Sequence, residues 1–151
     1  MKGFNKKDHS GSKKKSNIKK KPSKEKLIAQ AFKLHAQGNI IEAGKYYQSF
    51  IDENCNDYRV FSNYGVILCN LGKLKEAESL YRKAIQIKPD FAEAYSNLGV
   101  ILKNLGKLKE AELLCRKAIE IKPDFADAYL NFGNTLKVLG KLKEAELAYR
   151  K

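Results

Sequence analysis

A period of 34 residues governs most of this chain. Residues 58–91 and 92–125 align without a gap and are identical at 25 of 34 positions. The string Leu-Gly-Lys-Leu-Lys-Glu-Ala-Glu begins at Leu71 and returns at Leu105 and Leu139. Self-similarity at a fixed period of this length indicates stacked copies of one supersecondary unit, each covering the apolar face of its neighbour.

The same frame divides the chain from residue 24 onward into four registers. They are 24–57, 58–91, 92–125 and 126–151. The first is a divergent copy, which keeps Gly38, Ala43 and Tyr47 where the second has Gly72, Ala77 and Tyr81. The last copy is truncated at residue 151. We therefore expect one divergent repeat, two complete repeats and one partial repeat.

Each repeat has the signals of two helices, which are clearest in the third copy. Asp90 followed by Glu93 forms a capping-box pattern, which predicts that Asp90 caps a helix over about residues 92–105. Gly106 follows directly, and glycine accepts the left-handed conformation at which helices commonly end. A second helix is predicted over about residues 108–121. The pattern therefore predicts an all-α fold of helix hairpins.

The apolar residues of these two helices recur with helical spacing. One face of the first helix carries Tyr95, Leu98, Gly99 and Leu102, and one face of the second carries Leu108, Ala111, Cys115, Ala118 and Ile119. Gly99 and Ala111 are both small, so the two helices are expected to approach each other closely at this pair.

The third copy resembles the tetratricopeptide repeat family, whose pattern it matches at Tyr95, Leu98, Gly99, Leu102, Ala111, Cys115, Ala118 and Pro123. The first copy departs from the pattern, with Phe50 at the usual alanine and Cys55 at the usual proline. The resemblance implies a right-handed superhelical solenoid of antiparallel helix hairpins, whose first helices line a concave groove. It also implies binding of a peptide or partner protein. In style, residues 123–137 are most similar to the repeat arm of O-linked N-acetylglucosamine transferase-like proteins.

If the first helix of each repeat lines the groove, helical spacing identifies the side chains that a ligand meets. The second repeat offers Arg59, Asn63, Val66 and Asn70, the third Glu93, Asn97, Val100 and Asn104, and the fourth Asp127, Asn131, Asn134 and Val138. These are the candidate peptide-binding residues. A clamp for a C-terminal carboxylate is not expected, because the matching basic places hold Ser62, Glu93 and Asp127.

One column of this set repeats without change, at Asn63, Asn97 and Asn131. An asparagine amide both donates and accepts, so it can pair with a peptide backbone. Neighbouring helices pack roughly 8–10 Å apart, which places one asparagine beside about every third residue of an extended peptide. The resemblance agrees, because transferase arms of this style hold the peptide main chain with asparagines. The alternative is that these asparagines face water.

The net charge of +13 is concentrated at one end of the sequence. Residues 1–24 hold ten lysines and one acid, whereas the remaining residues carry a net charge of only +4. Few large apolar side chains occur there, so a disordered lysine-rich tail over residues 1–23 is expected. Its two clusters are Lys13, Lys14, Lys15, Lys19, Lys20 and Lys21. They allow weak contact with nucleic acid or anionic lipid, or they serve only as a solubilising leader.

The residues needed for catalysis are scarce. The chain has two histidines and three cysteines with no metal-binding spacing, and its glycines recur with the repeat and form no phosphate loop. We therefore expect no enzyme activity, no metal and no cofactor. An apolar run long enough to cross a membrane and a secretory signal are both missing, which favours a cytoplasmic protein with free thiols.

Three functions remain open at this stage. The first is a scaffold that binds an extended peptide or a partner protein in the concave groove. The second is the noncatalytic, substrate-recruiting arm of a longer glycosyltransferase or sulfotransferase. The third is an adaptor that contacts nucleic acid or an anionic membrane through the basic tail. The fourth repeat stops at Lys151 without a polar capping element, which indicates either a piece of a longer protein or an end that docks against a second copy.

Overall fold

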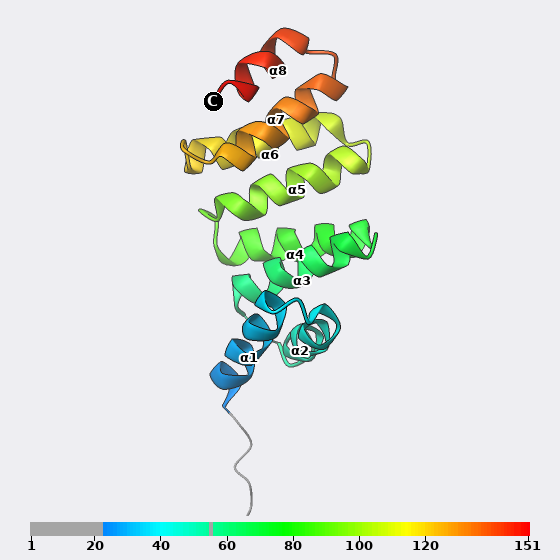
Figure 1. The fold of residues 1–151 in the computed structure, drawn as a ribbon, viewed down its shortest axis with the longest axis vertical. Coiled ribbons are helices and arrows are strands. Elements are labelled where there is room, and N and C mark those ends of the chain that lie inside the picture. Colours follow the sequence, from blue (N-terminus) through cyan, green and yellow to red (C-terminus); the bar gives the residue numbers. More distant parts are fainter. Residues whose placement is uncertain (1–22, 55) are drawn as a thin grey trace, which may run out of the picture.

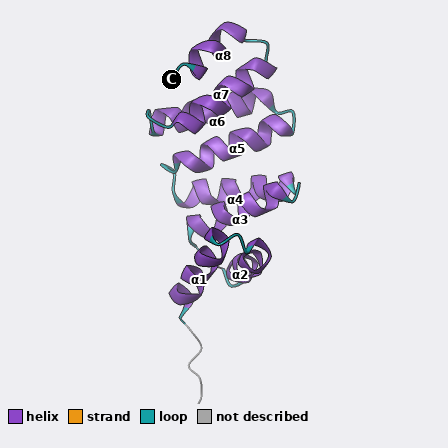
Figure 2. Cartoon of the chain, viewed as in Figure 1, coloured by secondary structure: helices purple, strands orange, loops and turns teal. Residues whose placement is uncertain are grey.

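The computed structural model describes residues 23–54 and 56–151. This part of the chain forms α-helices joined by short turns and contains no strand (Figure 2). The helices are α1 Lys24–Ala36, α2 Ile40–Asp52, α3 Tyr58–Asn70, α4 Leu74–Ile87, α5 Ala92–Asn104, α6 Leu108–Ile121, α7 Ala126–Val138 and α8 Leu142–Tyr149. The predicted disorder of the tail and the predicted contacts of its lysine clusters fall on residues 1–22, outside the described residues.

Consecutive helices pair into hairpins, and the hairpins stack along the long axis of the molecule (Figure 1). Each helix packs on the helix before it and the helix after it, and α5 also contacts α7. The predicted all-α solenoid of helix hairpins is therefore confirmed.

The turn inside each hairpin depends on a glycine with positive φ. In the third repeat Gly106 has φ +77°, and the Lys107 amide donates to the Leu102 carbonyl at 2.8 Å. This geometry satisfies carbonyls that the end of α5 leaves without a helical partner.

The predicted cap at the start of this repeat is wrong. Helix α5 has Phe91 as its N-cap residue and no side-chain cap, because Asp90 lies one residue too early, in the preceding turn. The Phe91 carbonyl accepts from the Ala94 amide at 3.0 Å. In the second repeat the same position is Asp57, whose carboxylate does cap α3 by accepting from the Arg59 amide at 2.9 Å.

The buried apolar residues form three clusters along the stacked hairpins. Leu98 and Leu102 of α5 are buried, and Cys115 of α6 packs against Gly99. A methyl group added at Gly99 would lie 2.7 Å from the Cys115 sulfur and 3.4 Å from the Ala111 carbonyl oxygen. The predicted close approach of the two helices is confirmed, with the Cys115 side chain filling the space beside the glycine.

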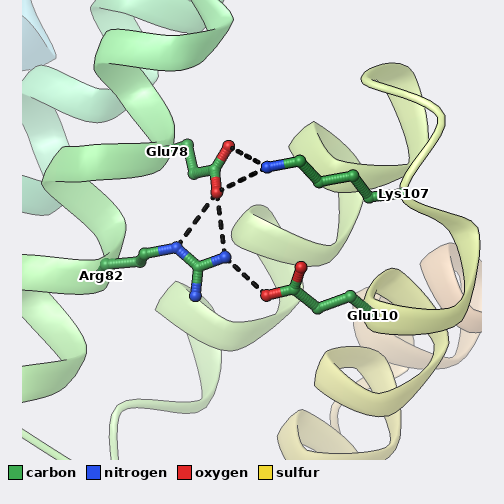
Figure 3. Close-up of polar contacts among 4 residues, drawn as sticks. All are labelled: Glu78, Arg82, Lys107 and Glu110. Carbon is green, nitrogen blue, oxygen red and sulfur yellow. Dashed lines mark hydrogen bonds and ion pairs between the residues drawn. The ribbon is translucent and has the colours of Figure 1, made fainter.

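Between the hairpins, charged side chains form a repeated set of ion pairs. Glu78 of α4 forms an ion pair with Lys107 at 3.1 Å (Figure 3). Arg82 forms ion pairs with Glu78 at 2.9 Å and with Glu110 at 2.5 Å. The next junction repeats this arrangement with Glu112, Arg116, Lys141 and Glu144. We call each set of four residues an ion ladder.

Candidate peptide-binding surface

Five of the predicted ligand-binding residues lie together around one hollow between α3 and α5. The hollow has a volume of about 350 Å³. The five residues are Val66, Asn70, Asn97, Val100 and Asn104. Repetition brings them together, because each position on α3 has its counterpart on α5 and the two helices belong to successive hairpins.

The chemistry of this hollow is neutral. None of the side chains lining it carries a formal charge. Asn70 and Asn104 are exposed, whereas Val66 and Val100 are half-buried. The surface therefore offers amide donors and acceptors next to small apolar patches. Such a surface suits a polypeptide main chain with uncharged side chains better than it suits a charged group.

The asparagine column is partly engaged within the array itself. Asn131 of α7 donates from Nδ2 to the Ser96 Oγ of α5 at 2.9 Å, which links two successive repeats. Thr135 Oγ1 donates in turn to the Asn131 backbone carbonyl at 2.8 Å. The Asn131 residue is only half-buried, and its amide has an acceptor oxygen and a second N–H besides the group that bonds to Ser96.

The other two asparagines of the column lie beside buried tyrosine hydroxyls. Burial raises the pKa of Tyr47 to about 12, and the Asn63 side chain acts in the opposite direction by hydrogen bonding. Burial also raises the pKa of Tyr81, which interacts with the Asn97 side chain in the same way. Asn63 and Asn97 thus each lie close to a buried tyrosine of the preceding repeat, and both residues are half-buried.

The remaining predicted residues lie away from the hollow. Arg59 forms an ion pair with Asp57 at 2.6 Å, and its guanidinium lies 5.2 Å from the centre of the Phe32 ring at the start of the array. Asn134 accepts from the Tyr149 hydroxyl at 2.9 Å. Both side chains therefore already have partners, which makes them less available to a ligand than Asn70 and Asn104.

Four residues that the sequence interpretation missed also line the hollow, namely Cys69, Leu74, Tyr81 and Ile101. Leu74 and Tyr81 come from α4, and counting along the first helix of each repeat cannot find them. Cys69 directly precedes Asn70, so a wider face on α3 would have included it. Burial raises the pKa of the Cys69 thiol, which keeps it protonated and a poor nucleophile.

In the part of the chain that the structure describes, His, Cys, Asp and Glu side chains form no cluster of three suited to a metal ion. None of the described helices combines the length and apolarity needed to cross a membrane.

The fold and this surface define an all-α solenoid of helix hairpins. Family models described as TPR repeat and tetratricopeptide repeat match residues 65–106, 92–125 and 114–147, and together they span residues 65–147. The chain belongs to the tetratricopeptide repeat family. The comparison with curated proteins gives no match.

Solved structures with the same fold come from proteins of different kinds. A crystal structure of MamA is similar with a TM-score of 0.77 and 22% identity, over 85% of this chain and 75% of that one. The first TPR of Spaghetti (RPAP3), bound to the HSP90 peptide SRMEEVD, is similar with a TM-score of 0.71 and 24% identity. The match covers 78% of this chain and 93% of that one. A Thermobaculum terrenum O-GlcNAc transferase mutant is similar with a TM-score of 0.68 and 19% identity, over 75% of this chain and 22% of that one. At these identities the likeness concerns the fold, and together with the family it supports a protein–protein interaction scaffold.

Proposed function

We propose that this scaffold binds an extended segment of a partner polypeptide along the face formed by α3, α5 and α7. The observation that carries the proposal is the neutral hollow between α3 and α5, where Asn70, Asn97 and Asn104 surround two valines. Amide groups at this spacing pair with peptide N–H and C=O groups, and Val66 and Val100 cover small apolar side chains of the ligand.

The expected ligand is a peptide that is held mainly by its main chain. The hollow lacks charged side chains, so it selects against a ligand whose own charge must enter it. The peptide in the RPAP3 structure shows that a repeat array of this fold can hold a peptide. Main-chain recognition gives affinity with limited sequence preference, as is also seen when peptides add to sheet edges.

The test uses random 15-residue peptides displayed on phage and selected on the whole chain. Selected peptides are synthesised with a fluorescent label and titrated by fluorescence polarisation. We expect one class of these peptides to bind the N70A/N104A variant about tenfold more weakly, because two net hydrogen bonds are lost. Both asparagines are exposed, so the variant should melt at the temperature of the unchanged chain. Unchanged affinity of every selected peptide for a folded N70A/N104A variant would contradict the proposal.

The asparagine column needs a separate control because Asn131 also bonds to Ser96. We expect the triple variant of Asn63, Asn97 and Asn131 to alanine to lose both affinity and some stability. Ser96→Ala removes the same inter-repeat bond and leaves the column intact. If Ser96→Ala weakens peptide binding as much as the triple variant does, the column acts only by joining the repeats.

A further inference from the structure

The first repeat lacks charge at three positions where the later repeats are charged. Ile41, Gly44 and Gln48 of α2 occupy the places that hold lysine, glutamate and arginine in the other three repeats. The corresponding residues are Lys75, Lys109 and Lys143, then Glu78, Glu112 and Glu146, and finally Arg82, Arg116 and Arg150. All three replacements lie on the same face of α2, since their spacing of three and four residues is helical.

These replacements leave an apolar hollow of about 730 Å³ between α2 and α3, which we call the α2–α3 groove. Gly44 contributes no side chain to it, and Tyr64 and Ile67 of α3 lie opposite. Along its edge Ile41 is 79% exposed and Leu71 is 65% exposed. Large apolar side chains exposed side by side around a concave space are typical of a binding surface.

The same place is filled at the later junctions. There the ion ladders occupy it, and the Arg116 guanidinium lies 4.6 Å from the centre of the Phe132 ring, whose counterpart in the second repeat is Tyr64. At the first junction, Gln48 accepts a hydrogen bond from the Tyr64 hydroxyl at 3.0 Å and forms no ion pair across the junction. Lys73, with no glutamate across the junction, pairs with Glu76 of its own repeat at 3.5 Å.

One end of the groove is acidic. Asp52 and Glu53 line it at the C-terminal end of α2, where the last turn carries no basic residue. The free carbonyl groups of a helix C-terminus add negative potential at the same point. Asp52 accepts from the Gln48 amide at 2.8 Å, and neither acid forms an ion pair within residues 23–54 and 56–151. Lys45 also lines the groove, but its ammonium group forms an ion pair with Glu42 at 3.2 Å. A cationic group is therefore favoured at the end of the groove formed by Asp52 and Glu53.

We propose that the α2–α3 groove is a second peptide-docking site, separate from the asparagine surface. Its occupant is a partner segment that places a bulky aliphatic side chain against Gly44 and Ile67 and a lysine or arginine beside Asp52 and Glu53. The two hollows share no residue, although both use α3. Residues 66 and 70 face one hollow and residues 64, 67 and 71 the other, roughly a third of a turn away around the helix.

A variant that rebuilds the ion ladder provides the test. In G44E/Q48R the first junction receives the glutamate and arginine of the later junctions, facing Lys73 and Glu76. A Cβ atom at position 44 would lie 3.8 Å from the Tyr64 ring, an ordinary contact, so the larger side chain has room to enter. We expect the variant to melt no lower than the unchanged chain and to have its groove filled by the new side chains.

The probes are the phage-selected peptides, sorted by the variant that they fail to bind. We expect one class that pairs an aliphatic residue with a nearby lysine or arginine. This class should lose at least about tenfold in affinity for G44E/Q48R and about threefold for D52N/E53Q, with unchanged affinity for N70A/N104A. If every selected peptide binds folded G44E/Q48R as tightly as the unchanged chain, the second site is refuted. That result leaves the asparagine surface intact, because its own peptides are identified independently through N70A/N104A.

Discussion

The first junction, between α2 and α3, and the second, between α4 and α5, solve the same packing problem with different residues. In both, a tyrosine on the second helix of one repeat is buried, at Tyr47 and at Tyr81. At the second junction an ion ladder lies over the contact. At the first junction the ladder is missing, and an open apolar groove takes its place.

This difference shows which contacts the stacking of repeats requires and which it can lack. Both junctions stack, so the buried apolar contacts suffice and the charged ladder is an addition on the surface. The first repeat also packs a larger residue, since Phe50 is buried where later repeats have Ala84 and Ala118. The charged surface of a repeat can therefore change into an open apolar surface without loss of the fold.

The largest expected effect tests the different packing of the first junction. Phe50→Ala gives this position the alanine of the later repeats, but it leaves a cavity because the neighbours are built around the ring. We expect a loss of about 3–5 kcal/mol. The measurement is urea unfolding followed by circular dichroism, with hydrogen exchange to locate the loss in α1 and α2.

The matched variant is Ala84→Phe, which inserts the ring at the second junction and should also destabilise, through overpacking. A cost below about 1 kcal/mol for Phe50→Ala would show that the first junction collapses as easily as an alanine junction.

Gly65 and Gly44 both lie in helices, but Gly65 is packed tightly against a ring whereas Gly44 borders the open α2–α3 groove. A methyl group at Gly65 would lie 2.8 Å from the ring of Tyr81, which is only 1% exposed and cannot move aside. Gly65→Ala should cost about 1–3 kcal/mol by overpacking. Gly44→Ala should instead stabilise by about 0.5–1 kcal/mol, because its nearest neighbour would be at 3.8 Å and alanine favours the helix.

Thermal unfolding of the two single variants gives the comparison directly. Opposite shifts of the melting temperature are expected. Equal shifts would mean that α2 and α3 close on the groove in solution.

The sequence predicts the repeated part of this architecture well. The 34-residue frame places the first helix of the third repeat at about 92–105 and the second at about 108–121, and the structure has Ala92–Asn104 and Leu108–Ile121. These elements follow from local signals, namely helical periodicity and the glycine turn. The Asp90 cap fails because one residue of offset decides which side chain reaches the free amides.

The surfaces were harder to predict because they depend on pairs of repeats. Counting along single helices found Val66, Asn70, Asn97, Val100 and Asn104, which do gather around one hollow. It could not show that Asn131 bonds to Ser96 across a junction. The α2–α3 groove was missed because its signal is that Ile41, Gly44 and Gln48 differ from the residues at the same positions of the later repeats. The 34-residue frame, in contrast, was established from positions that are identical between repeats.

The ion ladders of the later junctions should make the stability of the chain depend on pH. Hydrogen bonding from Lys141 lowers the pKa of Glu112 against the opposing effect of burial. For Glu78, burial raises the pKa, but Arg82 and Lys107 outweigh it and the net shift is downward. A lowered pKa in the folded state gives stability that is present above the ordinary value of 4.5 and is lost as the pH falls through the folded value.

The E78Q/E112Q variant should therefore cost about 0.5–1 kcal/mol per ladder at pH 7. It should also lose less stability than the unchanged chain between pH 5 and about pH 3. Urea titrations at several pH values, with and without 1 M salt, measure both effects, because salt weakens exposed ion pairs. If the free energy of unfolding falls equally with pH below 5 in the two proteins, the ladders do not contribute to the acid dependence of stability.

The smallest effect is expected at the first junction and in a different pH range. Burial lowers the pKa of His35, whose Nδ1 lies 3.2 Å from the Tyr47 hydroxyl. Because the folded state disfavours the charged imidazole, the associated stability is complete above the ordinary value of 6.5 and is lost as the pH falls through the lower folded value. The corresponding positions in the later repeats are Cys69, Lys103 and Lys137, which are not histidines.

Acid sensitivity just below pH 6.5 should therefore be confined to α1 and α2. Hydrogen exchange at pH 7.5 and pH 5.5, corrected for the intrinsic rates, should show faster opening of these two helices at the lower pH and little change in α5 and α6. His35→Gln keeps a polar group near Tyr47 but does not titrate, so it should remove the difference. If α1 and α2 loosen equally in this variant, the sensitivity arises elsewhere, and the two kinds of junction differ in packing alone.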